Sequence, residues 1–330
     1  MGDTVAIPQP GVSEMGEAQV IVFGEALVDA FADGPVPGGA PFNVACHLAA
    51  LGLSPRLLTR LGDDEAGRAL RQAAVRCNLS LDAAQHDEHT ARVLVHERDG
   101  GHAFEIPPAQ AFDRLDAAQA VAAVRAAGVT QPWLYFGTLA LRAPASRAAL
   151  AAVRAATPHR AFVDLNWREA GPPPAVILEL LHDVHVLKLS DAELAMLLHW
   201  LALAPMPDLP AIDDDHASMR TLCARTGARH VLVSHGADGA AAWDAEGRCV
   251  ARVAAPPLPQ RVDTVGAGDA FSAMMLAGLA LGHPLACMVG QAVAFASLSC
   301  GWRGALPTEM ALYRPWQGML ARAHAVETRA

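Results

Sequence analysis

Short, continuous apolar runs alternate along this chain with longer segments in which apolar residues recur at helical spacing. The first run, within residues 19–24, consists of consecutive apolar residues. Such a run makes both faces of a strand apolar, as a strand in a sheet covered on both faces requires. Further strands are predicted at residues 55–60, 133–136, 161–164, 184–188, 230–234, 239–243 and 250–253. Helices are predicted at residues 43–52, 65–77, 116–127, 146–156, 174–181, 191–198, 218–226 and 270–281. The alternation predicts an α/β fold with a doubly wound, mainly parallel sheet and helices on both faces.

Residues 90–106 carry a different pattern, which is typical of a β-hairpin. Ala91 and Val93 alternate with Arg92 at the period of a strand, and an Arg-Asp-Gly-Gly turn follows. A hairpin inserted into a βα pattern indicates a small accessory sheet, which we expect to form a lid from about residues 30–41 and 89–107. Unpaired edge strands favour association, so we expect the lid to pair in a homodimer.

Composition limits the partners and the compartment. The 330 residues carry a net charge of −9 with scattered Lys and Arg, so we expect no nucleic-acid partner. No apolar run reaches the length of a membrane span and no signal-peptide pattern opens the chain, so we expect a cytoplasmic protein without a membrane partner. We expect residues 1–18 to form a flexible leader, residues 19–315 one domain and residues 316–330 a C-terminal tail.

A glycine turn late in the chain carries the clearest chemistry. Residues 263–271 read DTVGAGDAF and open the apolar run that predicts a helix. Gly266 and Gly268 leave backbone amides uncovered where the helix N-terminus is positive, which favours binding of an anion, most often a phosphate. Asp269 has the wrong charge for anion binding alone. It is either a helix cap or a base placed beside a phosphate that is being transferred.

A second polar cluster follows the first predicted strand. Asp29, Asn43 and the backbone of Gly38 and Gly39 supply paired donors and acceptors of the kind that a sugar requires, although a turn and a helix cap would also explain them. The chain contains no G-x-x-x-x-G-K-[ST], G-x-S-x-G or H-E-x-x-H motif. P-loop, α/β-hydrolase and zinc-protease chemistry are therefore not expected.

Together these motifs resemble the ribokinase-like carbohydrate kinases, the PfkB family. The resemblance rests on residues 38–45 (GGAPFNVA) and 263–271, and residues 60–64 and 164–168 fit the same family. Residues 24–29, followed by residues 38–45 and Leu51-Gly52, look most like the bacterial fructokinases. It implies a ribokinase-like fold and a kinase domain spanning residues 19–315. It also implies transfer of the γ-phosphate of ATP to a sugar hydroxyl, with D-fructose converted to fructose 6-phosphate.

The resemblance also implies roles for individual residues. Asp269 is the implied general base, and the amides of Gly266, Ala267 and Gly268 would hold charge on the transferred phosphoryl group. Residues implied to bind the sugar are Asp29, Gly38, Gly39, Asn43, Asn166 and Arg168. Residues implied to bind ATP are Lys188, Ser234, Gly236, Gly239 and Thr264. Glu193 is implied to organise Mg²⁺ through water, and Asp263 is a candidate for a monovalent cation such as K⁺.

Three positions depart from the family pattern. Ser190 replaces the usual Asn before Glu193, His235 replaces an apolar or threonine-like residue, and Gly301-Trp302 replace a threonine-arginine pair. The departures at Ser190 and Gly301-Trp302 leave open a sugar- and nucleotide-sensing protein without turnover. Within the kinases, a ribokinase, a 2-keto-3-deoxygluconate kinase and a nucleoside kinase are the alternatives. A keto acid would require a further cation, for which Arg168 is the candidate.

Overall fold

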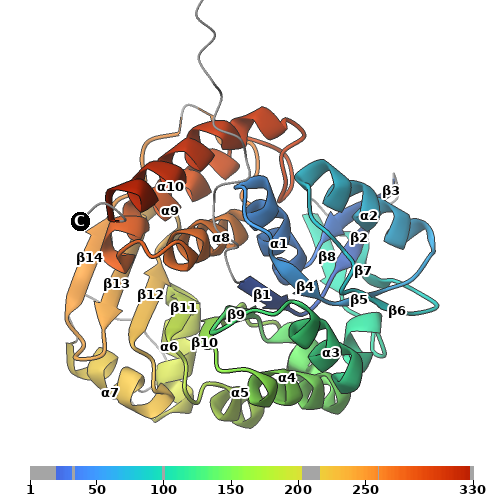
Figure 1. The fold of residues 1–330 in the computed structure, drawn as a ribbon, viewed down its shortest axis with the longest axis horizontal. Helices are drawn as coiled ribbons and strands as arrows, with labels where there is room; N and C mark the ends of the chain where they lie inside the picture. Colours follow the sequence, from blue (N-terminus) through green and yellow to red (C-terminus); the bar gives the residue numbers. More distant parts are fainter. Residues whose placement is uncertain (1–19, 32–33, 99–100, 203–215, 259, 328–330) are drawn as a thin grey trace, which may run out of the picture.

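The computed structural model describes residues 20–31, 34–98, 101–202, 216–258 and 260–327 (Figure 1). The predicted leader, residues 99–100 of the predicted hairpin turn and residues 203–215 lie outside the described residues. Within the described ranges, no helix combines the length and the apolar character that crossing a bilayer requires.

An eight-stranded sheet forms the centre of the molecule, in the order β14-β13-β12-β11-β10-β9-β1-β4. All neighbouring pairs from β12 to β4 are parallel, whereas β13 and β14 are antiparallel to their neighbours. The strands are β1 (Val20–Phe23), β4 (Arg56–Leu58), β9 (Trp133–Phe136), β10 (Arg160–Asp164), β11 (Val186–Ser190), β12 (His230–Ser234), β13 (Ala240–Asp244) and β14 (Cys249–Val253). The predicted doubly wound, mainly parallel sheet is confirmed.

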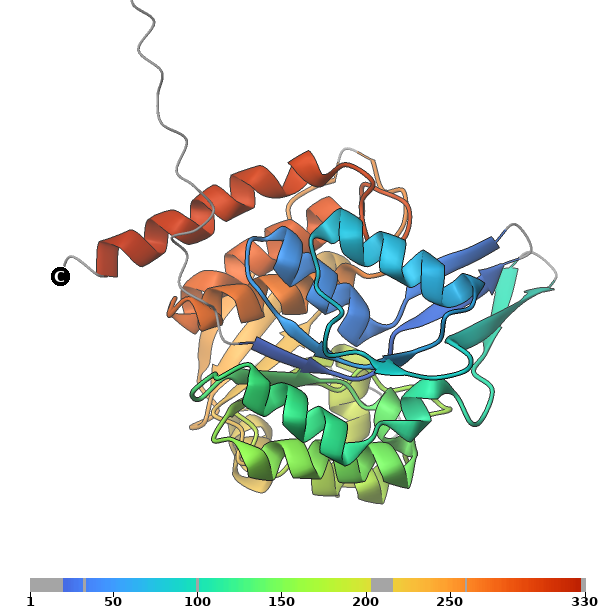
Figure 2. The same cartoon turned by 45° about the vertical axis from the view of Figure 1, so that its right-hand side comes forward.

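Helices cover both faces of this sheet (Figure 2). One face carries α1 (Ala40–Ala50), α2 (Glu65–Cys77), α8 (Ala267–Ala280), α9 (Leu285–Ser299) and α10 (Arg314–Glu327). The other face carries α3 (Ala117–Ala126), α4 (Pro144–Ala156), α5 (Pro174–Leu180), α6 (Asp191–Trp200) and α7 (His216–Thr226).

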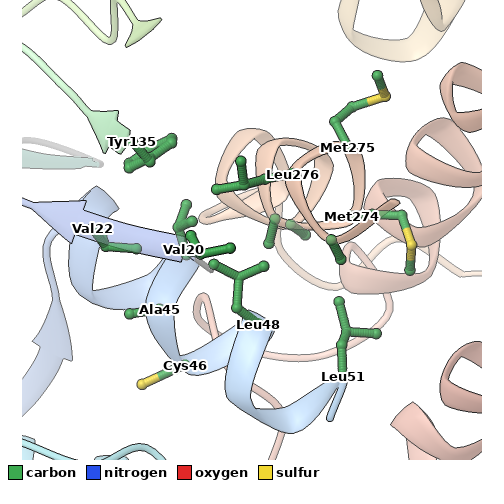
Figure 3. Close-up of a cluster of buried hydrophobic side chains, with 14 of the residues drawn as sticks. Val20, Val22, Ala45, Cys46, Leu48, Leu51, Tyr135, Met274, Met275 and Leu276 are labelled. Carbon is green, nitrogen blue, oxygen red and sulfur yellow. The ribbon is translucent and has the colours of Figure 1, made fainter. Parts of the chain in front are cut away.

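The central strand β1 explains why its sequence is apolar throughout. Val20 and Val22 belong to the core cluster that includes Leu48 of α1 and Leu276 of α8 (Figure 3). Ile21 and Phe23 point into the core on the opposite face. Because successive side chains of a strand alternate between faces, a strand covered on both sides requires an unbroken apolar run.

A separate four-stranded sheet, in the order β3-β2-β7-β8, confirms the predicted accessory sheet. Its strands are β2 (Leu27–Phe31), β3 (Gly34–Gly38), β7 (Ala91–Arg98) and β8 (Gly101–Glu105). Strands β5 (Arg60–Leu61) and β6 (Gln85–His86) form a third sheet of two strands, which among the described residues has no strand hydrogen-bonded to the other two sheets. Helix α1 begins at Ala40, at the end of the segment expected to form the lid, and Pro41 in its first turn needs no hydrogen bond for its nitrogen.

The C-terminal segment also differs from the prediction. Helix α10 runs through the expected boundary at residue 315, and Leu320 is fully buried in the main core. Trp316 packs edge-on against Phe295 of α9, with 5.3 Å between the ring centroids. The described part of this segment is therefore a packed helix rather than a tail.

Candidate active site

Several candidate residues lie where parallel strands of the main sheet end. Gly24 and Glu25 follow β1, Leu165 to Arg168 follow β10, and Ser190 ends β11. The carboxyl ends of parallel strands meet at one edge of a sheet, which is the usual ligand site of such folds. Asp29 is an exception: it lies within β2 of the small sheet, so the expectation that it follows a strand of the main sheet is wrong.

The glycine turn leaves the start of α8 open. Gly266 is its N-cap, with φ at 79°, and a Cβ there would lie 2.5 Å from the Cα of Ala305. Only glycine fits both the backbone conformation and this close contact. No side chain caps the helix, and no acceptor in the described part of the chain faces the amides of Gly268 and Asp269. These donors are available to an anion at the positive end of the helix dipole.

Asp269 lies in the first turn of α8 and is bonded to a residue from the opposite end of the chain. The Nδ2 of Asn43 donates to its Oδ2 at 2.8 Å, which makes Asp269 a partner of α1 rather than a cap of its own helix. Desolvation by burial raises the pKa of Asp269 to about 6, and the charge of Asp164 adds to this; the Asn43 hydrogen bond and the charges of Lys188 and Arg168 oppose it. A carboxylate with this pKa can accept a proton near neutral pH.

A buried ion pair lies directly beside this turn. Lys188 Nζ lies 3.0 Å from Asp164 Oδ1, and the two residues are 6% and 1% exposed. Ser272 of α8 donates to the other oxygen of Asp164 at 2.8 Å. A Cβ on Gly268 would lie 3.2 Å from Lys188 Nζ, so the ammonium lies against the first turn of α8. Burial lowers the pKa of Lys188, but Asp164, Glu193 and Asp269 outweigh it and the pKa is raised, so the ammonium stays charged.

The motif predicted to bind a sugar lies next to the end of β1. A Cβ on Gly39, where φ is 98°, would lie 2.7 Å from the carbonyl oxygen of Glu25. A Cβ on Gly38 would lie 3.5 Å from Oδ2 of Asp29. Burial raises the pKa of the Asp29 carboxyl. Glycines at these two positions therefore let the chain before α1 pass close to both acidic residues.

Glu25 is a site residue that the sequence reasoning missed. It is 3% exposed, and its Oε2 has no hydrogen-bond partner among the described residues. Burial raises its pKa to about 7, backbone amides and the charge of Arg168 oppose the rise, and the charge of Asp269 adds to it. Glu25 is thus a second carboxyl within electrostatic range of Asp269. An acidic residue directly after the strand that leads into the site is the signal that could have identified it.

The loop after β10 carries Asn166 and Arg168. Asn166 has a positive φ of 38°, which is uncommon for a residue other than glycine. Arg168 is exposed and donates from Nη1 to the carbonyl of Trp167 at 2.9 Å. Its charge opposes the raised pKa values of both Glu25 and Asp269, so it lies within electrostatic range of the two carboxyls.

The predicted nucleotide-binding residues lie on three segments: Lys188 in β11, Ser234, Gly236 and Gly239 at and after the end of β12, and Thr264 before the glycine turn. Gly236 and Gly239 have positive φ values of 56° and 101°, and Ser234 donates to the carbonyl of Leu189 at 3.3 Å. Thr264 is exposed. His235 is bonded through Nδ1 to Asp191 at 2.6 Å, so this departure from the family pattern joins the end of β12 to the start of α6. Thr264 accepts from the amide of Ala267 at 3.3 Å, whereas no hydrogen bond or ion pair among the described residues joins Ser234, Gly236 or Gly239 to Asp269.

The two predicted metal residues are already bonded to the protein. Asp263 accepts from the amides of Val265 and Gly304 at 3.0 and 2.9 Å, and these backbone hydrogen bonds lower its pKa. Both oxygens of Glu193 also accept hydrogen bonds. The described residues contain no group of three or more His, Cys, Asp and Glu placed to hold a metal ion.

Comparison with known proteins adds a family match. The model of the pfkB family of carbohydrate kinases matches residues 18–310. A fructokinase of Klebsiella pneumoniae is 33% identical over 285 residues, which cover 79% of this chain and 84% of that protein. An aminoimidazole riboside kinase of Salmonella typhimurium is 30% identical over 272 residues, which cover 77% of this chain and 78% of that protein.

Solved structures share the fold. Aminoimidazole riboside kinase from Salmonella enterica, in complex with aminoimidazole riboside and an ATP analog, has a TM-score of 0.71 at 23% identity and covers 90% of this chain and 99% of its own. Fructokinase from Vibrio cholerae, with fructose, ADP and calcium ion bound, has a TM-score of 0.69 at 22% identity. The match covers 90% of this chain and 98% of that structure's chain. At these identities the structures establish a common fold.

Proposed function

The chain belongs to the pfkB family of carbohydrate kinases, and we propose that it transfers the γ-phosphate of ATP to D-fructose, giving fructose 6-phosphate. The observation that carries the proposal is the position of Asp269. It accepts a hydrogen bond at 2.8 Å from Asn43, a residue of the proposed sugar motif, and lies in the first turn of a helix in which the amides of Gly268 and Asp269 have no acceptor among the described residues. A base between a sugar motif and an anion site is the arrangement that phosphoryl transfer to a hydroxyl requires.

In the proposed reaction, Asp269 accepts the proton of the attacking sugar hydroxyl. The sugar oxygen forms a bond to the γ-phosphorus while the bond to the bridging oxygen of ADP breaks, and the proton leaves later from Asp269 to solvent. The amides of the turn formed by Gly266, Ala267 and Gly268, together with the Lys188 ammonium, would hold the charge on the transferred group. Proton abstraction of this kind is worth about 10²–10⁴-fold in rate.

The sugar would lie between the two sheets. We propose that Asp29, Gly38, Gly39 and Asn43 bind its hydroxyls from one side, and that Asn166 and Arg168 bind from the loop after β10. The small sheet would close over the sugar and exclude water, which limits wasteful hydrolysis of ATP. The edges of the small sheet would pair in a homodimer, which light scattering after size-exclusion chromatography tests directly.

ATP would occupy the side of the glycine turn that faces β12. The proposed contacts come from Lys188, Ser234, Gly236, Gly239 and Thr264. We propose that Mg²⁺ is held mainly by the nucleotide phosphates, because the nearest carboxylates are already bonded within the protein. K⁺ near the loop of Asp263 is a further proposal. A cytoplasmic location follows from the use of ATP.

The experiment is coupled ADP release with fructose, ribose, 2-keto-3-deoxygluconate and aminoimidazole riboside, on the wild type and Asp269→Asn. We expect fructose to give the highest kcat/KM. Aminoimidazole riboside is the second candidate, because a kinase named for that substrate is 30% identical to this chain. Saturable sugar binding without ADP formation with any tested metal would instead indicate a sensing protein.

A further inference from the structure

The side-chain carboxylate of Glu193 accepts three hydrogen bonds from two different segments of the chain. Its Oε1 accepts from the backbone amide of Trp167 at 2.7 Å. Its Oε2 accepts from the backbone amide of Ser190 at 2.7 Å and from the Ser190 hydroxyl at 2.9 Å. Hydrogen bonds to an ionised carboxylate are stronger than those between neutral groups, and all three are short.

These bonds join the start of α6 to the loop after β10. Ser190 caps α6 and accepts from the amide of Glu193 at 3.3 Å, so the two residues form a capping box at the end of β11. A second contact joins the same two segments, because the ring of Trp167 packs edge-on against Trp200 of α6 at 6.3 Å between centroids. Trp167 is thus held by α6 at its backbone and at its side chain.

The loop held in this way is under local strain. Asn166, next to Trp167, adopts a φ of 38°, a left-handed conformation that is uncommon for a non-glycine residue and persists only where the surroundings enforce it. On the other side of Trp167, the charge of Arg168 acts on the carboxyls of Glu25 and Asp269 and opposes the rise of their pKa values. The bond from Glu193 to Trp167 therefore lies between the two residues that we assign to the sugar.

We propose that Glu193 is a positioning residue that clamps residues 166–168 for the acceptor sugar, in place of organising a divalent cation. This assignment rests on the proposed sugar kinase activity. A cation approaching Oε2 would have to displace or crowd two donors, and the Lys188 ammonium already supplies positive charge near this carboxylate. Ser190, where the family pattern has Asn, donates the third bond of the clamp.

Glu193→Gln tests the assignment, because an amide cannot accept at both ends. Whichever way the amide turns, its NH₂ group faces a backbone N–H, either that of Trp167 or that of Ser190. We expect KM for the sugar to rise about tenfold or more, as the loss of one such charged hydrogen bond implies. KM for ATP and the Mg²⁺ concentration for half-maximal rate should stay within about twofold. Amide hydrogen exchange in residues 166–168 should become faster.

Two further variants keep the test decisive. Ser190→Ala removes one of the three bonds and should shift the sugar KM in the same direction by a smaller factor, even if Glu193→Gln folds poorly. Glu179→Gln on the exposed side of α5 is the matched control and should change none of these values. A rise of tenfold or more in the required Mg²⁺ with an unchanged sugar KM overturns the proposal. Absence of sugar turnover in the wild type contradicts the proposed function instead, and hydrogen exchange then still reports whether the clamp exists.

Discussion

The side-chain amide of Asn43 donates to the carboxylate of Asp269 at 2.8 Å, across 226 positions of the sequence. The bond joins the first turns of α1 and α8, one carrying the sugar motif and the other the glycine turn. It orients the carboxylate and stabilises its ionised form, against a desolvation that raises its pKa to about 6. Two motifs that each allowed a purely structural explanation therefore form one site.

Asp269→Asn should abolish most of the sugar-dependent release of ADP. An amide cannot accept the proton of the sugar hydroxyl, so we expect kcat to fall by about 10²–10⁴-fold while KM for ATP changes little. In the wild type, kcat/KM should rise with pH through about 6, because Asp269 must be ionised to act. Asp82→Asn on the surface is the matched control. Retention of most activity in Asp269→Asn contradicts the assignment of the base.

Glu25→Gln should remove a pH-dependent cost to folding. The pKa of Glu25 is about 7 in the folded protein, above its value of 4.5 in an unfolded chain, so the folded state holds the proton more tightly. Stability is therefore lost as the pH rises from about 4.5 to about 7, by about 3 kcal/mol for a shift of this size. Urea unfolding at pH 5 and pH 8 should show a smaller loss of stability for Glu25→Gln than for the wild type. If the wild type and Glu25→Gln lost the same stability between pH 5 and pH 8, ionisation of Glu25 would not be the cause of the loss.

Much of the fold follows from local pattern, because a sheet covered on both faces imposes unbroken apolar strands and regularly spaced helices. Strand β3 could not be predicted in this way. Its sequence, Gly-Pro-Val-Pro-Gly, has two residues without a backbone N–H, and it is tolerated because β3 is an edge strand with only β2 as a neighbour. Helix α10 was not predicted, because burial of its side chains depends on tertiary contacts such as that between Trp316 and Phe295 of α9. The local sequence of residues 314–327 does not show these contacts.

The candidate site shows the same division between local and long-range information. Gly266, Gly268 and Asp269 are recognisable because a helix start with exposed amides has a local signature. The environment of Glu25 depends on Arg168 and Asp269, and the bonds of Glu193 depend on Trp167, so neither role is visible in one stretch of sequence. Family resemblance supplied the sugar and the nucleotide, which no local pattern specifies.

Gly266→Ala should disturb the anion-binding turn. The added methyl group would overlap Ala305 and force a positive φ of 79° on a residue with a Cβ. We expect about 2–5 kcal/mol of destabilisation, from the backbone strain and the overpacking together, and a fall in kcat. Gly128→Ala is the matched control: φ is 62° and the added methyl group meets open space, so only the backbone cost of about 1–2 kcal/mol should appear. Similar unfolding midpoints for the two variants would contradict the role of the Ala305 contact.

Lys188→Met should separate the structural and chemical roles of the buried ion pair. Removal of the ammonium leaves Asp164, which is 1% exposed, as an uncompensated charge, and such losses cost about 3–5 kcal/mol. The double variant Lys188→Met with Asp164→Asn removes both charges and retains an acceptor for Ser272, so we expect its stability to recover most of this loss. Activity should stay about 10²-fold or more below the wild type in both variants, because the ammonium beside Gly268 is absent in each. Urea unfolding and coupled ADP release measure the two effects independently. Recovery of activity together with stability in the double variant would show that Lys188 serves only to neutralise Asp164.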